Sequence, residues 1–124
     1  MTKELIQKLI VRAKDATDNA YCPITEVAIG ACLLVDGNQT VTGCNIESFR
    51  MGAGQVALAK AISDGITGFR AIAFWSEKVM PFPSGAELDC IAEFAPSIDI
   101  IVASKDNFSM HKIHELLPIR SIYD

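Results

Sequence analysis

The stretch Gly43-Cys44-Asn45-Ile46-Glu47 is the most distinctive part of this sequence of 124 residues. It closes a predicted strand over residues 40–45, whose partner strand is the apolar run at residues 28–35. Between the two strands lies Asp36-Gly37-Asn38, whose composition is typical of a tight hairpin turn. Asn45 and Glu47 place an amide and a carboxylate beside this hairpin, and both groups can form hydrogen bonds to a hydroxyl.

Helices and strands alternate on both sides of the hairpin. Apolar residues at helical spacing predict a first helix over residues 3–19 and a second over 54–64, which Gly65 ends. Pro83 and Ser84 open a third helix that runs to about residue 94. Further strands are predicted at residues 69–75, 98–103 and 108–113, and a short last helix ends at 116–118. This alternation predicts one α/β domain over residues 1–124, with a mixed sheet covered by helices on both faces.

Composition limits the classes of partner. The chain has 11 basic and 15 acidic residues, a net charge of −4, which argues against a nucleic acid as the main partner. No apolar run reaches the length needed to span a membrane, and Lys3 and Glu4 open an amphipathic helix instead of a signal peptide. The four cysteines show no CxxC spacing and no zinc-module pairing with histidine. We therefore expect a cytoplasmic protein with free thiols and no membrane partner.

The chain resembles the small cytidine deaminases over nearly its whole length. Five segments occur in the order found in that family. They are Tyr21-Cys22-Pro23, Ala28-Ile29-Gly30-Ala31, Gly43-Cys44-Asn45-Ile46-Glu47, Lys60-Ala61-Ile62-Ser63-Asp64-Gly65 and Glu115-Leu116-Leu117-Pro118. The resemblance implies a three-layer α-β-α sandwich around a five-stranded mixed sheet. It also implies a homo-oligomer, a tetramer or a dimer, because small members of the family share active sites between subunits.

The resemblance suggests where a ligand would bind. In the family, the residues at Asn45 and Glu47 contact the ribose hydroxyls, so these two are candidate contacts for a nucleoside. The alternative is that they cap strand ends and bond backbone groups. Val27 stands where the family usually has an aromatic residue that stacks on the base. Phe49 and Arg50, in a loop about four residues shorter than usual, are candidates for new stacking or anion contacts.

The residues that carry the family's chemistry are not found at the matching positions. Family members hold zinc with three cysteines and move protons with a glutamate, so that bound water becomes hydroxide. Gly52, Ser84 and Glu87 stand at the cysteine positions, and Gly54 stands at that of the glutamate. Only Glu87 has a side chain that commonly coordinates metal. We therefore expect no metal site and no cofactor, with the family's zinc absent.

Other residues offer alternatives for the missing site. Glu87 is a candidate general base if an apolar pocket raises its pKa, but capping of its own helix is the favoured interpretation. His111 and His114 are interpreted as solvated or edge histidines, and Cys90 as a buried small hydrophobe. The starts of the second and third helices, where N–H groups converge, could bind an anion or water.

The leading hypothesis is a catalytically inactive homologue, retained to bind a nucleoside-like ligand or small anion, or for oligomeric interaction. One alternative is a nucleoside deaminase or hydrolase that acts through a non-standard site around Glu87 and Glu47. A second alternative is a structural subunit that assembles with an active paralogue. The sequence leaves open whether the chain is an enzyme.

Overall fold

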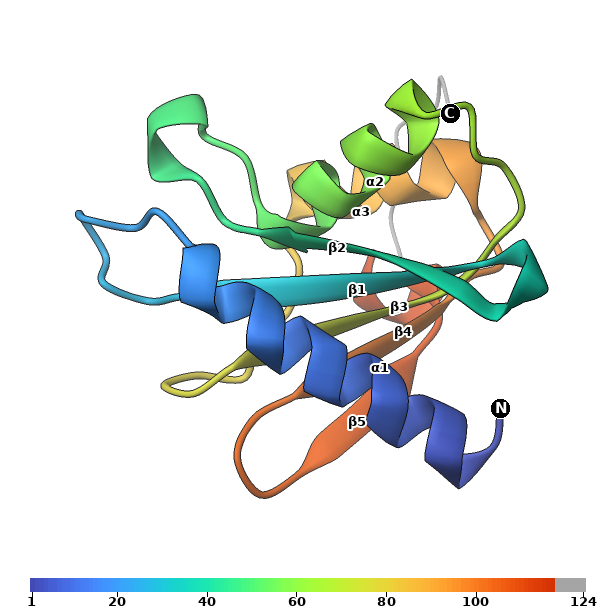
Figure 1. The fold of residues 1–124 in the computed structure, drawn as a ribbon, viewed down its shortest axis with the longest axis horizontal. Helices are drawn as coiled ribbons and strands as arrows, with labels where there is room; N and C mark the ends of the chain where they lie inside the picture. Colours follow the sequence, from blue (N-terminus) through green and yellow to red (C-terminus); the bar gives the residue numbers. More distant parts are fainter. Residues whose placement is uncertain (118–124) are drawn as a thin grey trace.

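The computed structural model describes residues 1–117, which form a five-stranded sheet between two layers of helices (Figure 1). The helices are α1 (Lys3–Ala16), α2 (Ala53–Ser63), α3 (Gly85–Phe94) and α4 (Ile113–Leu116), and short 3-10 turns lie at η1 (Thr17–Asn19), η2 (Asp36–Asn38) and η3 (Glu47–Phe49). The strands are β1 (Ile29–Val35), β2 (Gln39–Cys44), β3 (Phe69–Ser76), β4 (Asp99–Ala103) and β5 (Phe108–His111).

The sheet has the order β2-β1-β3-β4-β5, so the predicted mixed sheet is confirmed. Among the named strands of residues 1–117, β3 and β4 form the parallel pair, and α3 makes the crossover that such a pair requires. The other neighbours are antiparallel, including the β1–β2 hairpin, in which Gly30 faces Cys44 and Val35 faces Gln39. The hairpin turns through η2, where Gly37 adopts a φ of 79° that favours glycine.

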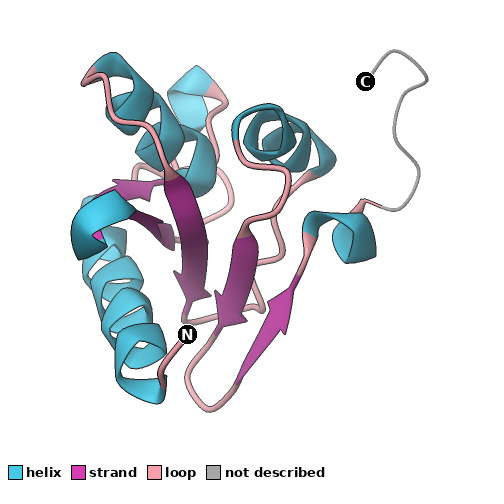
Figure 2. Ribbon diagram, turned by 90° about the vertical axis from the view of Figure 1, so that its right-hand side faces the viewer, coloured by secondary structure: helices cyan, strands magenta, loops and turns pink. Residues whose placement is uncertain are grey.

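Each face of the sheet has its own hydrophobic core, because side chains alternate along the strands. Ala31, Leu33, Ile72, Phe74 and Ile100 point to the side of α2 and α3. Cys32, Leu34, Ala73, Trp75 and Ile101 point to the side of α1, where Ile6, Leu9 and Ala13 cover them. Figure 2 shows the sheet between these two helical layers. The three-layer α-β-α sandwich predicted from the sequence is therefore confirmed.

Element ends differ modestly from the prediction. The first helix stops at Ala16, because η1 tightens the chain before it enters the loop at Ala20. The last strand ends at His111, and Lys112 caps α4 in an extended conformation. Pro118, predicted to follow the last helix, lies outside the described residues. None of the helices within residues 1–117 combines the length and hydropathy needed to cross a membrane.

Candidate functional site at the starts of α2 and α3

The sheet brings the first turns of α2 and α3 together on one face. Gly52 is the N-cap of α2 and Ser84 is the N-cap of α3, and both have extended backbones with ψ near 160°. Ser84 Oγ accepts from Glu87 N at 3.1 Å, and Gln55 Oε1 accepts from Gly52 N at 2.9 Å. The first turn of a helix leaves N–H groups without partners inside the helix, so two such turns together form a place that favours negative charge.

The carboxylate of Glu87 occupies this place. Its Oε1 accepts from Ser84 N at 3.3 Å and closes the cap of its own helix. Its Oε2 accepts from Gly54 N at 3.0 Å, across the gap at the start of α2. Only 8% of the residue is exposed. One carboxylate therefore joins the starts of both helices, which is more than the capping of α3 expected from the sequence.

Gly52 and Gly54 leave the room that this carboxylate needs. A Cβ atom at Gly52 would lie 2.5 Å from both carboxylate oxygens of Glu87. A Cβ atom at Gly54 would lie 2.7 Å from Cζ of Phe74 and 3.0 Å from Oε2 of Glu87. These distances are far below normal contact, so any side chain at either position would have to displace its neighbours. The position that matches the family's acid-base glutamate is thus closed by Phe74 and Glu87.

Burial dominates the ionisation of Glu87. Desolvation raises its pKa above the ordinary value of 4.5, and the N–H groups of Ser84, Gly54 and Gln55 offset this only in part. A carboxyl group with a raised pKa can serve as a general base. Both oxygens of Glu87, however, already accept hydrogen bonds from the backbone.

Asn45 and Glu47 lie together at the end of β2, and each holds the neighbouring loop. Asn45 Oδ1 accepts from Ile29 N at 3.0 Å, and Asn45 Nδ2 donates to Val27 O at 2.9 Å. The carboxylate of Glu47 accepts from Ile24 N at 2.7 Å and from Thr25 Oγ1 at 2.7 Å. Both side chains therefore bond backbone groups, as the alternative interpretation described. Their role as sugar contacts stays a prediction, and so does the place of Val27 in a ligand site.

The pKa of Glu47 is shifted in the opposite direction to that of Glu87. The Thr25 hydroxyl has the largest effect and lowers it; desolvation opposes this, and the N–H groups of Ile24 and Thr25 lower it further. Glu47 is therefore stabilised in its ionised form. The sequence does not single out Thr25, because a threonine in a polar loop carries no pattern that links it to a glutamate 22 positions later.

The remaining candidates lie apart from the two helix starts or make weak contacts there. His111 is on β5, where its Nε2 lies 2.7 Å from Ser109 Oγ, and His114 is exposed on α4. Cys90 is half-buried on α3, and its Sγ is 3.9 Å from Gln55 Nε2. Within residues 1–117 no group of three or more His, Cys, Asp or Glu side chains is arranged to hold a metal ion.

No family model matches the chain, but individual proteins do. It is 38% identical over 94 residues to a cytidine deaminase of Sporosarcina psychrophila, covering 72% of this chain and 69% of that protein. A probable cytidine deaminase of Dictyostelium discoideum is 31% identical over 124 residues, covering 95% and 84% of the two chains. This chain belongs to the cytidine deaminase family. A crystal structure of the cytidine deaminase from Burkholderia pseudomallei matches the fold with a TM-score of 0.85 and 28% identity, over 95% of this chain and 98% of that one.

Family membership corrects one prediction. The expectation of no cofactor, with zinc absent, is wrong, because the chain's relatives are cytidine deaminases and that is a family of zinc enzymes. That expectation rested on the side chains of four residues that match the family's zinc and acid-base positions, namely Gly52, Gly54, Ser84 and Glu87. Ligands to a metal can also come from other positions or from water, so these four positions do not establish that zinc is absent.

The side chains at the matched positions nevertheless differ from a catalytic zinc site. Such sites use three protein ligands, usually histidine, cysteine or a carboxylate, and leave one position open. Gly52 offers no ligand atom, Ser84 Oγ accepts a backbone N–H, and the Glu87 oxygens do the same. The side chains of Gly52, Ser84 and Glu87 therefore do not fit a three-ligand zinc at this place.

The packing of Gly54 leads to a stability prediction. We expect Gly54→Ala to lower the free energy of unfolding by about 1–3 kcal/mol, because the added methyl group overpacks a closed space. Gly85→Ala is the matched control, since Gly85 is also in the first turn of a helix but has no heavy atom within 4 Å of an added Cβ. Urea denaturation should show Gly85→Ala unchanged or stabilised by up to about 1 kcal/mol. Equal effects at the two positions would contradict the packing described.

A second prediction concerns pH. Because the folded state raises the pKa of Glu87, it retains a proton at pH values where the unfolded chain has lost it. The contribution of Glu87 to the free energy of unfolding should therefore fall as pH rises from about 4.5 through the raised pKa, and stay constant above it. Glu87→Gln removes this titration. The free energy of unfolding is measured for both proteins across this pH window. The value for the wild type minus the value for Glu87→Gln should decrease as pH rises. Parallel curves would contradict the raised pKa of Glu87.

Proposed function

We propose that this chain is a member of the cytidine deaminase family that does not deaminate cytidine. In this proposal it acts as a binding or assembly module, and its ligand is nucleoside-like or a small anion. The observation that carries the proposal is the Glu87 carboxylate, which is bonded to the starts of both α2 and α3. The fold of the family is retained, and the place between its two helix starts is filled by a side chain of the protein itself.

The geometry at Gly54 supports the loss of the reaction. Deamination in the family needs a glutamate that moves protons between water and the base. Gly54 stands at that position, and Phe74 and Glu87 leave no room for a side chain there. Glu87 is no simple replacement, because its two oxygens accept the N–H groups of Gly54 and Ser84. A general base must accept a hydrogen bond from the water whose proton it takes, and both oxygens of Glu87 are already bonded to the backbone.

The loops beside β2 support a binding role. Asn45 and Glu47 hold these loops through the backbone, and each side chain keeps oxygen lone pairs that a ligand hydroxyl could use. Phe49 follows on η3 with 71% of its surface exposed, and Arg50 next to it is also exposed. An exposed ring and a guanidinium that follow Asn45 and Glu47 in the chain are of the chemical kind that would suit a nucleoside or its phosphate.

A turnover assay tests this proposal. The purified protein is incubated with cytidine in buffer with added zinc, next to the cytidine deaminase of Sporosarcina psychrophila as the active reference. We expect uridine only from the reference enzyme. Metal content is measured on the same preparation, so that the assay refers to a protein of known zinc loading.

Binding is measured separately, by titrating cytidine, uridine and their monophosphates and following the melting temperature. Phe49→Ala should reduce any shift and leave the ligand-free melting temperature unchanged, because the Phe49 ring is exposed. Uridine formed by the wild type and lost in Glu87→Ala would overturn the proposal in favour of a non-standard catalytic site. Absence of any nucleoside response would restrict the proposal to assembly.

A further inference from the structure

The carboxylate of Glu87 is held by backbone N–H groups from two different helices. Ser84 N donates to Oε1 at 3.3 Å, and Gly54 N donates to Oε2 at 3.0 Å. Burial raises the pKa of this carboxyl, and the N–H groups of Ser84, Gly54 and Gln55 oppose that rise. Within residues 1–117 no charged side chain is among the causes of the shift. The carboxylate is thus recognised by three neutral donors at fixed positions, which we call the N–H cradle.

The N–H cradle has the size of a carboxyl group. A Cβ atom at Gly52 would lie 2.3 Å from Cδ of Glu87 and 2.5 Å from each of its oxygens, and these are its three nearest atoms. A Cβ atom at Gly54 would lie 2.7 Å from the ring of Phe74, which closes another side. Glu87 is only 8% exposed. An occupant of the cradle therefore has to be planar and about as small as a carboxylate.

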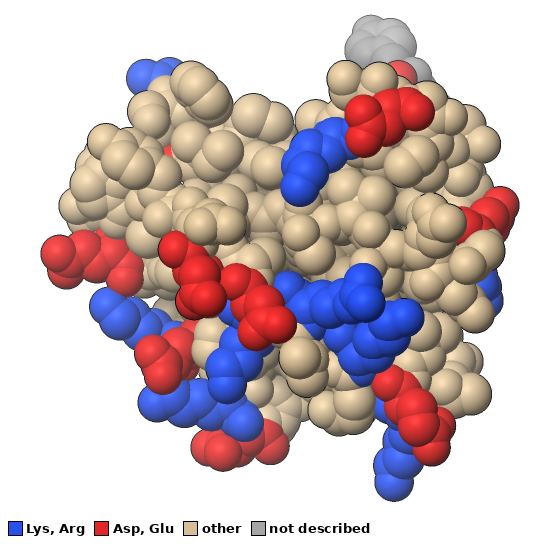
Figure 3. Space-filling view, viewed as in Figure 1, with Lys and Arg blue, Asp and Glu red and all other residues tan. Residues whose placement is uncertain are grey.

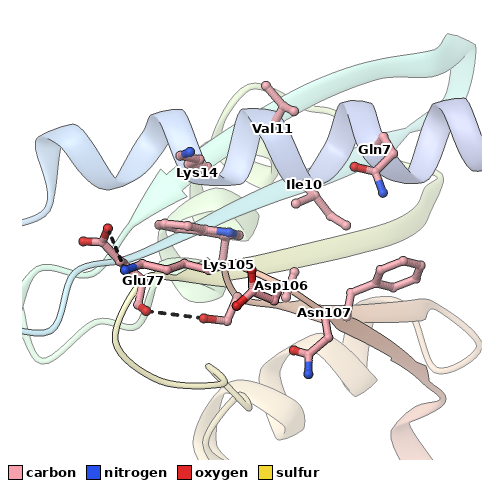
Figure 4. Close-up of a pocket in the computed structure, with 12 residues that line it drawn as sticks. Gln7, Ile10, Val11, Lys14, Glu77, Lys105, Asp106 and Asn107 are labelled. Atoms are coloured by element: carbon pink, nitrogen blue, oxygen red, sulfur yellow. Dashed lines mark hydrogen bonds and ion pairs between the residues drawn. The ribbon is translucent and has the colours of Figure 1, made fainter.

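A hollow on the opposite face of the sheet shows no such preference for one sign of charge. It has a volume of about 530 Å³ and lies between α1 and the β4–β5 turn (Figure 4). Two cations and two anions line it, namely Lys14, Lys105, Glu77 and Asp106. Lys105 Nζ is 3.5 Å from Glu77 Oε1, and Figure 3 shows charges of both signs over this part of the surface. Such a hollow does not select the charge of a ligand, whereas the N–H cradle presents donors to an anion.

We infer that the N–H cradle is a binding site for a small carboxylate, and that Glu87 fills it from within the chain as an autoinhibitory contact. The inference rests on the proposed function and deepens it, because it names the class of the small anion and the group that competes with it. The class of ligand is identified by the group bound there: a carboxylate whose two oxygens each accept an N–H from a different helix.

The same donors disfavour other anions. A phosphate is tetrahedral and carries up to two charges, which neutral N–H groups in a buried place compensate poorly. A carboxylate is planar and carries one charge. Because Glu87 is tethered to α3, its carboxylate is present at a high effective concentration in the cradle. A free carboxylate therefore binds when the side chain of Glu87 is removed, and not in competition with it at millimolar concentration.

Glu87→Ala tests this inference, because the substitution removes Cγ and the carboxyl group, which are the heavy atoms of acetate. We expect acetate to raise the melting temperature of the variant saturably, by about 5 °C at ten times its dissociation constant. Neither sodium chloride at equal ionic strength nor acetamide, which has the size of acetate without its charge, should reproduce this shift. If the variant does not fold alone, acetate should restore its far-UV circular dichroism.

Two matched variants keep the same place filled. Glu87→Gln retains a side chain of the same size and should show no acetate-specific shift. In the double variant Gly52→Ala with Glu87→Ala, the new methyl group lies where the carboxyl carbon was, so the dissociation constant for acetate should rise at least about tenfold. Gly52→Ala should also lower the melting temperature much more in the wild type than in Glu87→Ala. The four proteins form a double-mutant cycle that reports the overlap of the two side chains.

Several outcomes would overturn the inference. These are equal shifts with acetate and chloride, a response of Glu87→Gln as large as that of Glu87→Ala, and an unfolded Glu87→Ala that acetate does not restore. A saturable response of the wild type in the same concentration range would refute the autoinhibitory contact. The turnover assay contains no acetate. Uridine formed by the wild type would therefore refute the proposed function, whereas a missing acetate response would refute the carboxylate site.

Discussion

The hydrogen bonds from the α2 and α3 backbones to the carboxylate of Glu87 are the interaction on which one side of this molecule depends. The sheet order places the first turns of both helices beside each other, and each turn presents N–H groups that need an acceptor. Two helix N-termini so close together repel unless negative charge lies between them. Glu87 supplies that charge from within α3, and its side chain is nearly buried. Glu87 therefore accepts N–H groups at the starts of both helices while these helices pack on the sheet.

This arrangement makes several residues depend on one another. The carboxylate fits only because Gly52 and Gly54 have no side chains, and Phe74 fills the rest of the space from β3. Ser84 orients Glu87 through reciprocal hydrogen bonds at the start of α3. Loss of one partner would leave either a buried charge or unbonded N–H groups, both of which are costly. The differences from the family pattern at Gly52, Gly54 and Glu87 are thus best understood as one coupled change.

The fold could be predicted from local patterns, and the contacts of the site could not. The positions of the helices and strands follow from signals between sequence neighbours. These signals are the alternating apolar runs, the turn at Gly37 and the cap at Ser84. Asn45 and Glu47 stand out in the sequence because they lie in a distinctive block. Their partners Val27, Ile24 and Thr25 could not be assigned, because these bonds depend on how a loop folds back on β2. The hydrogen bond between Glu87 and Gly54 joins residues 33 positions apart. It forms because α2 and α3 pack side by side, which no local pattern in the sequence predicts.

The two faces of the sheet differ in the contacts that their covering helices make. On the side of α2 and α3, the carboxylate of Glu87 lies between the starts of two helices and accepts N–H groups from both. On the side of α1, Val11 and Phe108 are exposed, and Nζ of Lys14 lies 5.4 Å from the centroid of the Trp75 ring. The first face binds its polar groups within the protein, and the second leaves large apolar side chains in contact with solvent. The packing of Glu87 therefore constrains one face of the sheet through hydrogen bonds, whereas apolar contacts with α1 constrain the other.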